Sequence, residues 1–347
     1  GITPGGELVR LDADLDVDLA DLPLAEQYSA QFGLARLPAA PLRSRTGLFV
    51  LALRPVEFSA NPVAAYPTTL TGPRTVEDGD IVEATAVVLV PWQDDGAALS
   101  LEARRSAAAR TVFTRSEQAL ASANVLPIAM LALQGNTLVW IDEAMVRREL
   151  GANRDDLPGL GFAPRGLRLA HLMQYQTHLA DVVAQLSGRP FPAASRFQAL
   201  PPAGPLPPGA IDTADFTQRY FPSQVDVDFS IIPDDELPAL VEESLALPTI
   251  DLLDSDAALD LTAVLVLAPV PRADFRTVLA RLESRVRLLK AAAPNLVAAR
   301  KPLEILQQLR LPVPVATPAA ATPSDAEWAR LAGLNNLWYV RRRNLAY

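Results

Sequence analysis

The chain has 347 residues, half of them hydrophobic and 20% charged, which is a globular composition with room for two or three domains. Its formal net charge of −9 argues against non-specific attraction to nucleic acid or to an anionic membrane, and no stretch approaches the ~20 apolar residues of a membrane span. Because the sequence contains no cysteine, disulfides, thiolate metal sites and cysteine nucleophiles are excluded.

The N-terminal region alternates acidic and apolar residues, with aspartates at 12, 14, 16 and 18. A period of two places the carboxylates on one face and the apolar side chains on the other, which predicts a strand with a solvated acidic face. The same spacing resembles a calcium-binding loop, but Val17 stands where such a loop requires glycine. The sequence therefore favours the strand, and we expect no metal and no cofactor.

Residues 1–160 are expected to form a β-rich domain with one helix and one hairpin. Strands are predicted at 47–58 and 80–91, and the turn signals Asn61-Pro62 and Asp78-Gly79 lie between them. Since the second strand is almost continuously apolar, we expect it to be buried on both faces.

The rest of this domain is predicted to contain a helix over 99–121, which is rich in alanine, arginine and leucine. Two apolar runs, 125–133 and 137–142, are joined by Gln134-Gly135-Asn136 and predict a hairpin. A short helix is expected at 143–150, before Gly151.

Residues 161–222 are expected to form a helix followed by a proline-rich strap. Apolar spacing predicts an amphipathic helix over 167–186. This helix carries the only two histidines of the chain, His171 and His178, which are seven residues apart and too distant to bind one zinc ion. We expect both to have hydrogen-bonded structural roles.

The strap has five prolines between residues 201 and 208. Each proline fixes φ and removes a backbone donor, which excludes a helix or a central strand. The apolar residues Leu200, Leu206 and Ile211 indicate that the strap lies against protein.

Residues 223–310 are expected to form a strand–helix–strand–helix domain, with strands at 224–232 and 261–268 and a long helix at 273–291. Pro233 is predicted to open the first of its helices. A short helix is expected at 302–309. Residues 311–347 are then expected to form a linker and a C-terminal helix capped by Ser324. The predicted fold class is α+β and multi-domain: an antiparallel β-rich N-terminal part with amphipathic helices, and a smaller α/β-type C-terminal part.

The sequence offers no convincing catalytic site. No serine stands in a Gly-x-Ser-x-Gly motif, and no nucleotide-binding fingerprint is present. The acidic residues Asp234 to Glu236 are explained by the start of a helix. We therefore expect no catalytic residues and no enzymatic activity, although a carboxylate-based hydrolase is retained as an alternative because acidic residues are plentiful.

The C-terminus is the best candidate for a protein interface, because aromatic and arginine side chains are enriched at interfaces. The candidate interface residues are Trp338, Tyr339, Arg341, Arg342 and Arg343, with Phe221 of the strap second. A C-terminal helix docked on its own domain, with the arginines near the negative end of its dipole, explains these residues equally well.

Three stretches carry a family resemblance. They are the entry Ile2-Thr3-Pro4-Gly5, the run 49–90, and the strap around 200–204 with Phe221-Pro222 and 247–252. They resemble uncharacterised bacterial and phage structural proteins associated with phage tails or contractile injection systems, either baseplate- or fibre-associated. The resemblance implies a structural subunit that packs against other subunits of a large assembly, in a particle assembled in the bacterial cytoplasm. It transfers no catalytic residue.

A surface adhesin or glycan-binding module is the alternative function. Carbohydrate recognition would require exposed aromatic side chains, and Trp92, Tyr66 and Trp140 are the candidates for that role.

Overall fold

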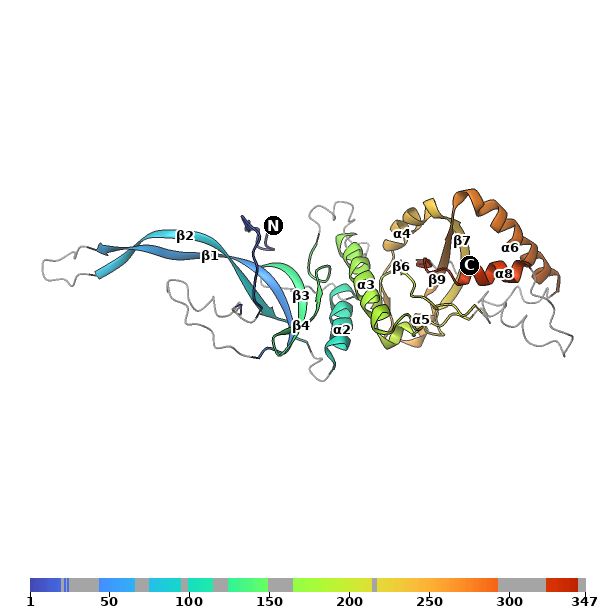
Figure 1. The fold of residues 1–347 in the computed structure, drawn as a ribbon, viewed down its shortest axis with the longest axis horizontal. Helices are drawn as coiled ribbons and strands as arrows, with labels where there is room; N and C mark the ends of the chain where they lie inside the picture. The colour runs from blue at the N-terminus through green and yellow to red at the C-terminus, as the bar shows by residue number, and fades with distance from the viewer. Residues whose placement is uncertain are drawn as a thin grey trace. The chain divides into compact units, whose positions relative to one another are not determined.

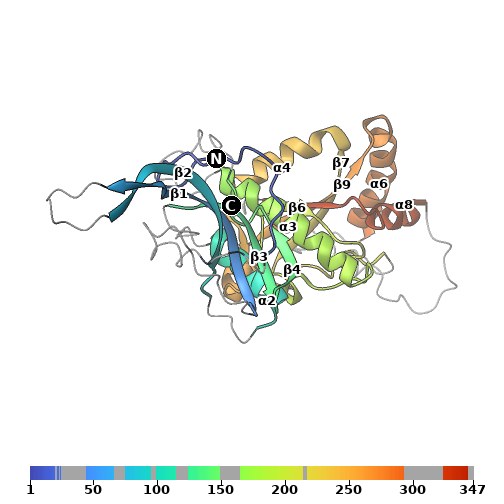
Figure 2. The same ribbon diagram turned by 60° about the vertical axis from the view of Figure 1, so that its left-hand side comes forward.

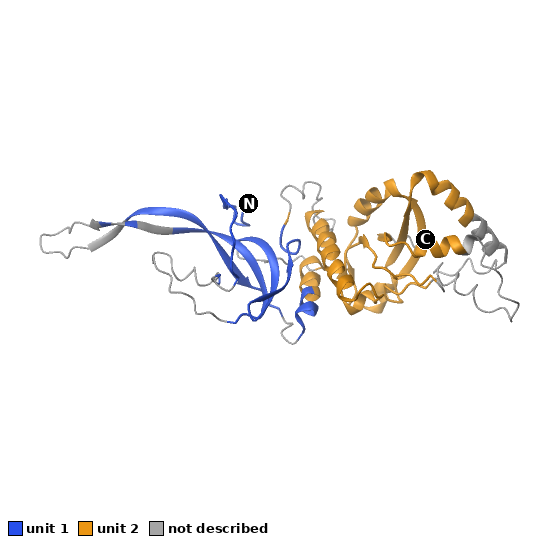
Figure 3. Ribbon diagram, in the orientation of Figure 1, with its two compact units in different colours: residues 1–105, 117–147 blue, residues 106–116, 148–347 orange. Residues whose placement is uncertain are grey.

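The computed structural model describes residues 1–19, 22, 24, 44–65, 75–94, 99–114, 124–148, 165–213, 217–292 and 323–342. Helices and sheets contribute nearly equally, at 32% and 33%, which confirms the α+β class (Figure 1). The chain divides into two compact units: unit 1 contains residues 1–105 and 117–147, and unit 2 contains residues 106–116 and 148–347 (Figure 3).

Unit 1 contains a four-stranded antiparallel sheet with the order β2-β1-β3-β4. Its strands are β1 (Gly47–Ala65), β2 (Thr75–Pro91), β3 (Leu126–Gln134) and β4 (Thr137–Asp142). Gly135 and Asn136 connect β3 to β4 with φ angles of 59° and 69°. Both angles are positive, as a tight type I′ turn requires, and the predicted hairpin is confirmed.

β1 and β2 are longer than the sequence predicts, and they run past the expected turns. Pro62 pairs with Asp78, so neither Asn61-Pro62 nor Asp78-Gly79 ends a strand. Asn61 adopts a φ of 56° opposite Gly79, where an added Cβ would lie 3.2 Å from the Asn61 carbonyl oxygen. The local turn signals were misleading because cross-strand pairing continues through them.

β3 pairs with β1 only from Gly47 to Leu53. Beyond this point β1 and β2 continue together as a two-stranded ribbon of residues 54–65 and 75–86, which no third strand joins in the part of the chain that is described. Figures 1 and 2 both show β1 and β2 extending past β3 and β4.

Two other predictions for unit 1 are wrong. Residues 12–18 form no strand, because they have no partner strand among the described residues, and the nearest pairing is an isolated bridge between Ile2 and Leu8. Residues 143–148 form turns rather than a helix, with the N–H groups of Val146 and Arg147 donating to the Glu143 carbonyl.

Helix α2 (Leu101–Thr114) contributes to both units, since the division falls between Arg105 and Ser106. The remainder of the predicted helix at 99–121 lies outside the described residues after Thr114. In unit 2, Arg110 of α2 forms two hydrogen bonds of 2.8 Å with Asp251.

Unit 2 begins with the predicted amphipathic helix, α3 (Arg165–Gln185). Ser187 and Gly188 have φ angles of 53° and 73°, and the Gly188 N–H donates to the Val183 carbonyl at 2.9 Å, which is a Schellman helix end. The strap follows, with the 3₁₀ turn η1 (Ala193–Ser195) and the short strands β5 (Ala199–Leu200) and β6 (Ala203–Pro205). Leu200, Leu206 and Ile211 are buried, as predicted.

The sheet of unit 2 has the order β6-β10-β9-β7, and the segment predicted as strand–helix–strand–helix also contains a short strand and a short helix that were not predicted. β7 (Asp226–Pro233) lies parallel to β9 (Ala263–Val270). Between these strands the chain forms η2 (Asp234–Glu236), α4 (Leu237–Leu245), β8 (Ile250–Asp251) and α5 (Asp256–Asp260). Helix α6 (Arg272–Ala292) follows β9. Pro233 is extended, with ψ of 136°, so the α-helix begins at Leu237 and not at Pro233.

The prediction for the C-terminus requires the largest correction. Helix α8 (Pro323–Ala332) begins before Ser324, and Trp338–Arg342 form strand β10 rather than the end of a helix. β10 is antiparallel to both β9 and β6. Aromatic and β-branched residues favour strands, and the partner strands were hidden because they lie far away in sequence. The helix predicted at 302–309 and most of the linker lie outside the described residues.

The four predicted segments do not appear as four units. Helix α3, the strap, the strand–helix repeat and β10 all belong to unit 2, so this unit is larger than the C-terminal part that the sequence suggested. The boundaries expected at residues 160 and 310 lie outside the described residues.

Candidate interaction surfaces

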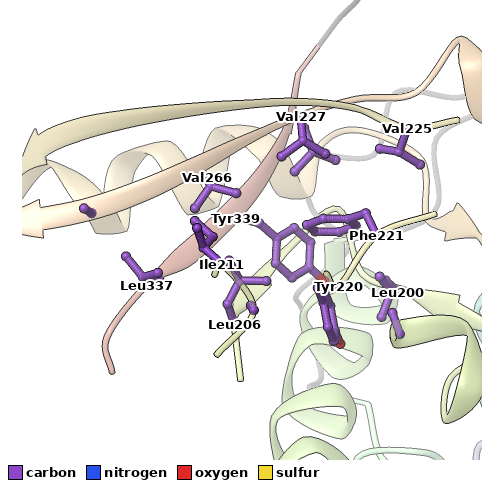
Figure 4. Close-up of a cluster of buried hydrophobic side chains, with 14 of the residues drawn as sticks. Leu200, Leu206, Ile211, Tyr220, Phe221, Val225, Val227, Val266, Leu337 and Tyr339 are labelled. Atoms are coloured by element: carbon purple, nitrogen blue, oxygen red, sulfur yellow. The ribbon is translucent and has the colours of Figure 1, made fainter. Parts of the chain in front are cut away.

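Two of the predicted interface residues are core residues of unit 2. The Tyr339 ring is 0% exposed, and its centroid lies 5.2 Å from that of Phe221 and 6.0 Å from that of Tyr175. Phe221 is also buried, and Figure 4 shows the Tyr339 ring next to that of Phe221 within the apolar cluster, where the two rings meet edge-on. Since these two rings hold the strap against the sheet, they are unavailable to a partner.

The buried tyrosine hydroxyls of this core are hydrogen-bonded. The hydroxyls of Tyr175 and Tyr220 are 2.8 Å apart, and those of Tyr175 and Tyr339 donate to the carbonyls of Pro205 and Pro201. Burial raises the pKa of all three tyrosines above the ordinary value, so they stay neutral. The strap is thus bound through its own carbonyls.

The remaining C-terminal candidates are partly buried. Arg341 donates to the carbonyls of Pro248 and Thr249 at 2.7 and 3.0 Å, and burial lowers its pKa. Arg342 is paired with Asp226 and Asp228, and burial raises the pKa of Asp228 although Arg342 opposes this shift. These contacts dock the terminus on its own unit, but as strand β10 and not as the docked helix of the alternative prediction.

Trp338, also partly buried, packs against a cluster that includes Ala203 and Leu267. Arg343 lies outside the described residues. The C-terminal segment is therefore mainly a structural part of the sheet.

Both histidines are buried in unit 2. The ring of His171 stacks on Phe113 with centroids 4.3 Å apart, and its Nδ1 lies 3.5 Å from the Thr249 hydroxyl. Burial, with a smaller contribution from the charge of Arg148, lowers the pKa of His171 to about 3. His178 packs edge-on against Phe197. These surroundings indicate packing roles, and no group of three histidine, aspartate or glutamate side chains within the described ranges could hold a metal ion.

A buried ion pair in unit 1 was missed by sequence reasoning. Arg105 of α2 lies 2.9 Å from Asp142 at the end of β4, and the two side chains are 0% and 1% exposed. Asp142 also accepts from the Met145 N–H at 3.2 Å, while the Arg105 guanidinium lies 5.1 Å from the Trp140 ring centroid. The pair fixes the start of α2 against the sheet. No signal in the sequence connects these two residues.

The ribbon carries the two most exposed apolar side chains among the described residues of the unit 1 sheet, Ile81 and Val63, whereas its Val82 is less exposed than Leu138, Val139 and Ile141 of β4. Ile81 is 74% exposed, Val63 52% and Val82 37%. Glu57 and Glu83 are directly opposite each other and both exposed. Like charges in this arrangement destabilise a strand pair, and a two-stranded hairpin is marginally stable in water by itself. A contact that covers the ribbon would therefore stabilise it.

A recess of about 590 Å³ lies at the base of the ribbon, between it and the N-terminal segment. The Thr85 hydroxyl in its wall donates to the Arg10 carbonyl at 3.0 Å, and the lining carries both signs of charge, including Arg10, Arg54, Glu57 and Glu83. Arg10 is paired with Asp12 at the surface, at 2.8 Å. This open, charged recess contains no metal-binding group within the described residues.

The aromatic residues proposed for glycan binding are not gathered on one surface. Trp140 is 6% exposed, and its indole N–H donates to the Leu101 carbonyl at 3.2 Å. Trp92 is partly buried, and Tyr66 lies outside the described residues. Trp140 is therefore unavailable for stacking on a sugar.

Comparisons with known proteins give no relative from which a role can be transferred. No protein-family model matches the chain, and no match is found among curated proteins or solved structures. None of the helices in the described part of the chain has the length and apolarity needed to cross a membrane.

Proposed function

We propose that this chain is a structural subunit of a phage-tail-like particle, a baseplate or tail-associated component that acts by packing against other subunits. The observation that carries the proposal is the ribbon: two strands leave the sheet of unit 1 and present Ile81, Val63 and Val82 to solvent. Exposed apolar surface on a marginally stable hairpin is typical of a segment that is completed by another chain.

The setting rests on the sequence resemblance, one part of which covers the ribbon. The run 49–90, which resembles proteins of phage-tail-like particles, contains both ribbon strands. The segment that points to a particle and the segment that is best suited to packing are therefore the same.

A packing role also accounts for the unusual buried groups. Arg105 is paired with Asp142, His171 is stacked on Phe113, and Tyr339 is hydrogen-bonded to the strap. Each of these residues fixes one part of the fold to another. Their contacts need no turnover to explain them, so the proposal is a subunit without catalytic activity.

The test is incorporation into particles. The chain, carrying an epitope tag, is produced in the cells that make the particle, and particles are isolated by ultracentrifugation and imaged in negative stain with gold-labelled antibody. We expect the full chain to sediment with labelled particles. A trimmed variant, in which a short glycine-containing turn replaces residues 58–82 between the opposed Glu57 and Glu83, is expected to be incorporated at least tenfold less.

The trimmed variant serves as its own folding control. Because the ribbon lies outside the buried clusters of unit 2, the variant should keep the circular dichroism and the cooperative unfolding of that unit. A full-length chain that is always recovered as a free monomer and never with particles would refute the proposed function.

A further inference from the structure

The second half of α2, residues 106–114, belongs to unit 2 and contacts α3 through a buried ring stack. The ring of Phe113 lies nearly parallel to that of His171, with centroids 4.3 Å apart and an interplanar angle of 8°. Phe113 is 5% exposed and His171 is 1% exposed, so water is excluded from the stack. The stack is therefore the apolar centre of the contact between this segment and α3.

Two further contacts of this segment with unit 2 are polar. The side chains of Arg110 and Asp251, which form an ion pair, are 26% and 22% exposed. The Gln198 N–H donates to the Ser106 hydroxyl at 2.7 Å. Water can replace each of these polar partners when the segment moves away, at a small cost in free energy. The ring stack is therefore the contact that most strongly favours the docked position.

The surroundings of His171 fit a neutral imidazole. The Thr249 hydroxyl donates to the Phe113 carbonyl at 3.4 Å, and its oxygen lies 3.5 Å from the His171 Nδ1, where it can accept from an Nδ1–H. The Nε2 atom then carries no hydrogen, and it is buried without a hydrogen-bond partner. Protonation would add a second N–H at Nε2, and this donor would be buried and unsatisfied.

Two arginines from other segments bring positive charge to this site. The guanidinium of Arg148 lies 5.6 Å from the Phe113 ring centroid, and its charge opposes protonation of His171. Arg341 of β10 donates to the Thr249 carbonyl at 3.0 Å. A proton on His171 would therefore add a like charge to a site that already contains cations.

The other charged groups of these elements do not offset this positive charge. Asp251 of β8 is bound to Arg110 of α2 by two hydrogen bonds of 2.8 Å. On α3 itself, Arg168 lies one turn before His171 and is also a cation. The imidazole can therefore carry a proton only after it reaches water, which requires the two stacked rings to separate.

We infer that His171 and Phe113 form an acid-sensitive latch, which holds residues 106–114 on α3 while the imidazole is neutral and releases them when it takes up a proton. A helical segment of this length is marginally stable in water by itself, so its amides exchange with solvent once it is released. The inference goes beyond the proposed function and does not rest on it, because the latch operates within unit 2 of the free chain.

The direction of the effect follows from the pKa of His171. Burial lowers this pKa to about 3 in the docked state, against an ordinary value of ~6.5 for a solvated ring. Because the released state binds the proton more tightly, the docked state loses stability as pH falls below ~6.5. Between pH 7 and 5 the equilibrium constant for release is expected to rise about 25-fold.

Amide hydrogen exchange of the full chain at pH 7 and pH 5 measures the release, after correction for the intrinsic pH dependence of exchange. Peptides that cover residues 106–114 are compared with peptides of β9, which report opening of the core of unit 2. We expect residues 106–114 to exchange faster than β9 at both pH values, because release needs only local opening. Their protection should fall about 25-fold between pH 7 and 5.

Two histidine variants separate the latch from other effects of acid. His171→Phe can keep the stack and does not titrate, so the protection of residues 106–114 should differ less than twofold between the two pH values. His178→Phe is the matched control, because His178 is also buried on α3 but packs against Phe197, and this variant should keep the 25-fold change. His171→Gln, which also does not titrate, repeats the test if His171→Phe does not fold.

Three results would overturn the inference. The first is exchange of residues 106–114 at the rate of β9, which would mean that they open only with the whole unit. The second is protection of residues 106–114 that stays the same between pH 7 and 5 in the wild type. The third is a pH response that remains in the His171 variants.

Discussion

The two four-stranded sheets of this chain differ in how they end: the sheet of unit 2 ends at a proline-containing edge strand, whereas two strands of the unit 1 sheet continue beyond it. In unit 2, the edge strand β6 belongs to the strap, where Pro201, Pro202 and Pro205 offer no N–H groups, and the aromatic strand β10 lies inside the sheet. In unit 1, β1 and β2 continue beyond the sheet as a ribbon with exposed apolar residues on its surface. The contrast shows that a segment rich in proline or aromatic residues need not be an interface, because in unit 2 the prolines of the strap and the aromatic residues of β10 complete a core.

The largest effect on stability is expected at the buried ion pair of unit 1. Arg105→Met removes the partner of the buried Asp142 carboxylate and should lower the free energy of unfolding by about 3 to 5 kcal/mol. Arg10→Met is the matched control, because the pair of Arg10 with Asp12 is fully at the surface, and it should change stability by less than about 0.5 kcal/mol. Urea denaturation measures both. Equal effects would show that the Arg105–Asp142 pair is not buried.

A matched pair of isoleucines compares the core of unit 2 with the ribbon. Ile250 is 1% exposed and Ile81 is 74% exposed. Ile250→Ala should cost about 2 to 4 kcal/mol, because it leaves a cavity, whereas Ile81→Ala should cost less than about 0.5 kcal/mol. Thermal unfolding of the monomer, at low concentration, checks both values. A large loss for Ile81→Ala would mean that the ribbon is packed against its own chain.

A smaller effect is expected from pH in unit 2. The pKa of His171 is lowered to about 3 in the folded chain, against an ordinary value of ~6.5, so the unfolded chain binds the proton more tightly. The stability contributed by the neutral ring is present above pH ~6.5 and is lost as pH falls towards 3. Between pH 7 and 5 the loss is about 2 kcal/mol.

His171→Phe isolates this contribution, because phenylalanine can keep the stacking on Phe113 and does not titrate. The difference in unfolding free energy between the wild type and the variant should change by about 2 kcal/mol between pH 7 and 5. Denaturant titrations at the two pH values give this difference. If the difference is the same at both values, His171 is solvated in the folded protein.

Sequence patterns predicted the elements whose signal is local and strong. The apolar run of β9 and the helical spacing of α3 and α6 gave the correct elements, and the apolar residues of the strap were buried as expected. Predictions from local patterns were wrong where pairing with a strand that is distant in sequence determines the structure. Asn61-Pro62 reads as a turn, yet it lies within a strand because Gly79 and its neighbours are opposite.

The candidate surface was largely hidden from sequence reasoning for the same reason. Trp338 and Tyr339 followed by arginines resemble an interface anchor, but their ladder partners, Gly204 and Leu267 among them, make them part of a sheet. The ribbon could be recognised only once the register of β1 against β2 was known. Likewise, Arg105 and Asp142 form an ion pair although they are 37 positions apart in the chain.

The central claim is that the ribbon is open in the free chain and covered in an assembly. Amide hydrogen exchange measures this directly, by comparing ribbon peptides in the dilute free chain with the same peptides in isolated particles, and β9 peptides serve as the internal reference. We expect ribbon amides to exchange much faster than β9 amides in the free chain, and at least tenfold more slowly once the chain is in particles. Ribbon amides that exchange at the same rate in both states would contradict the account.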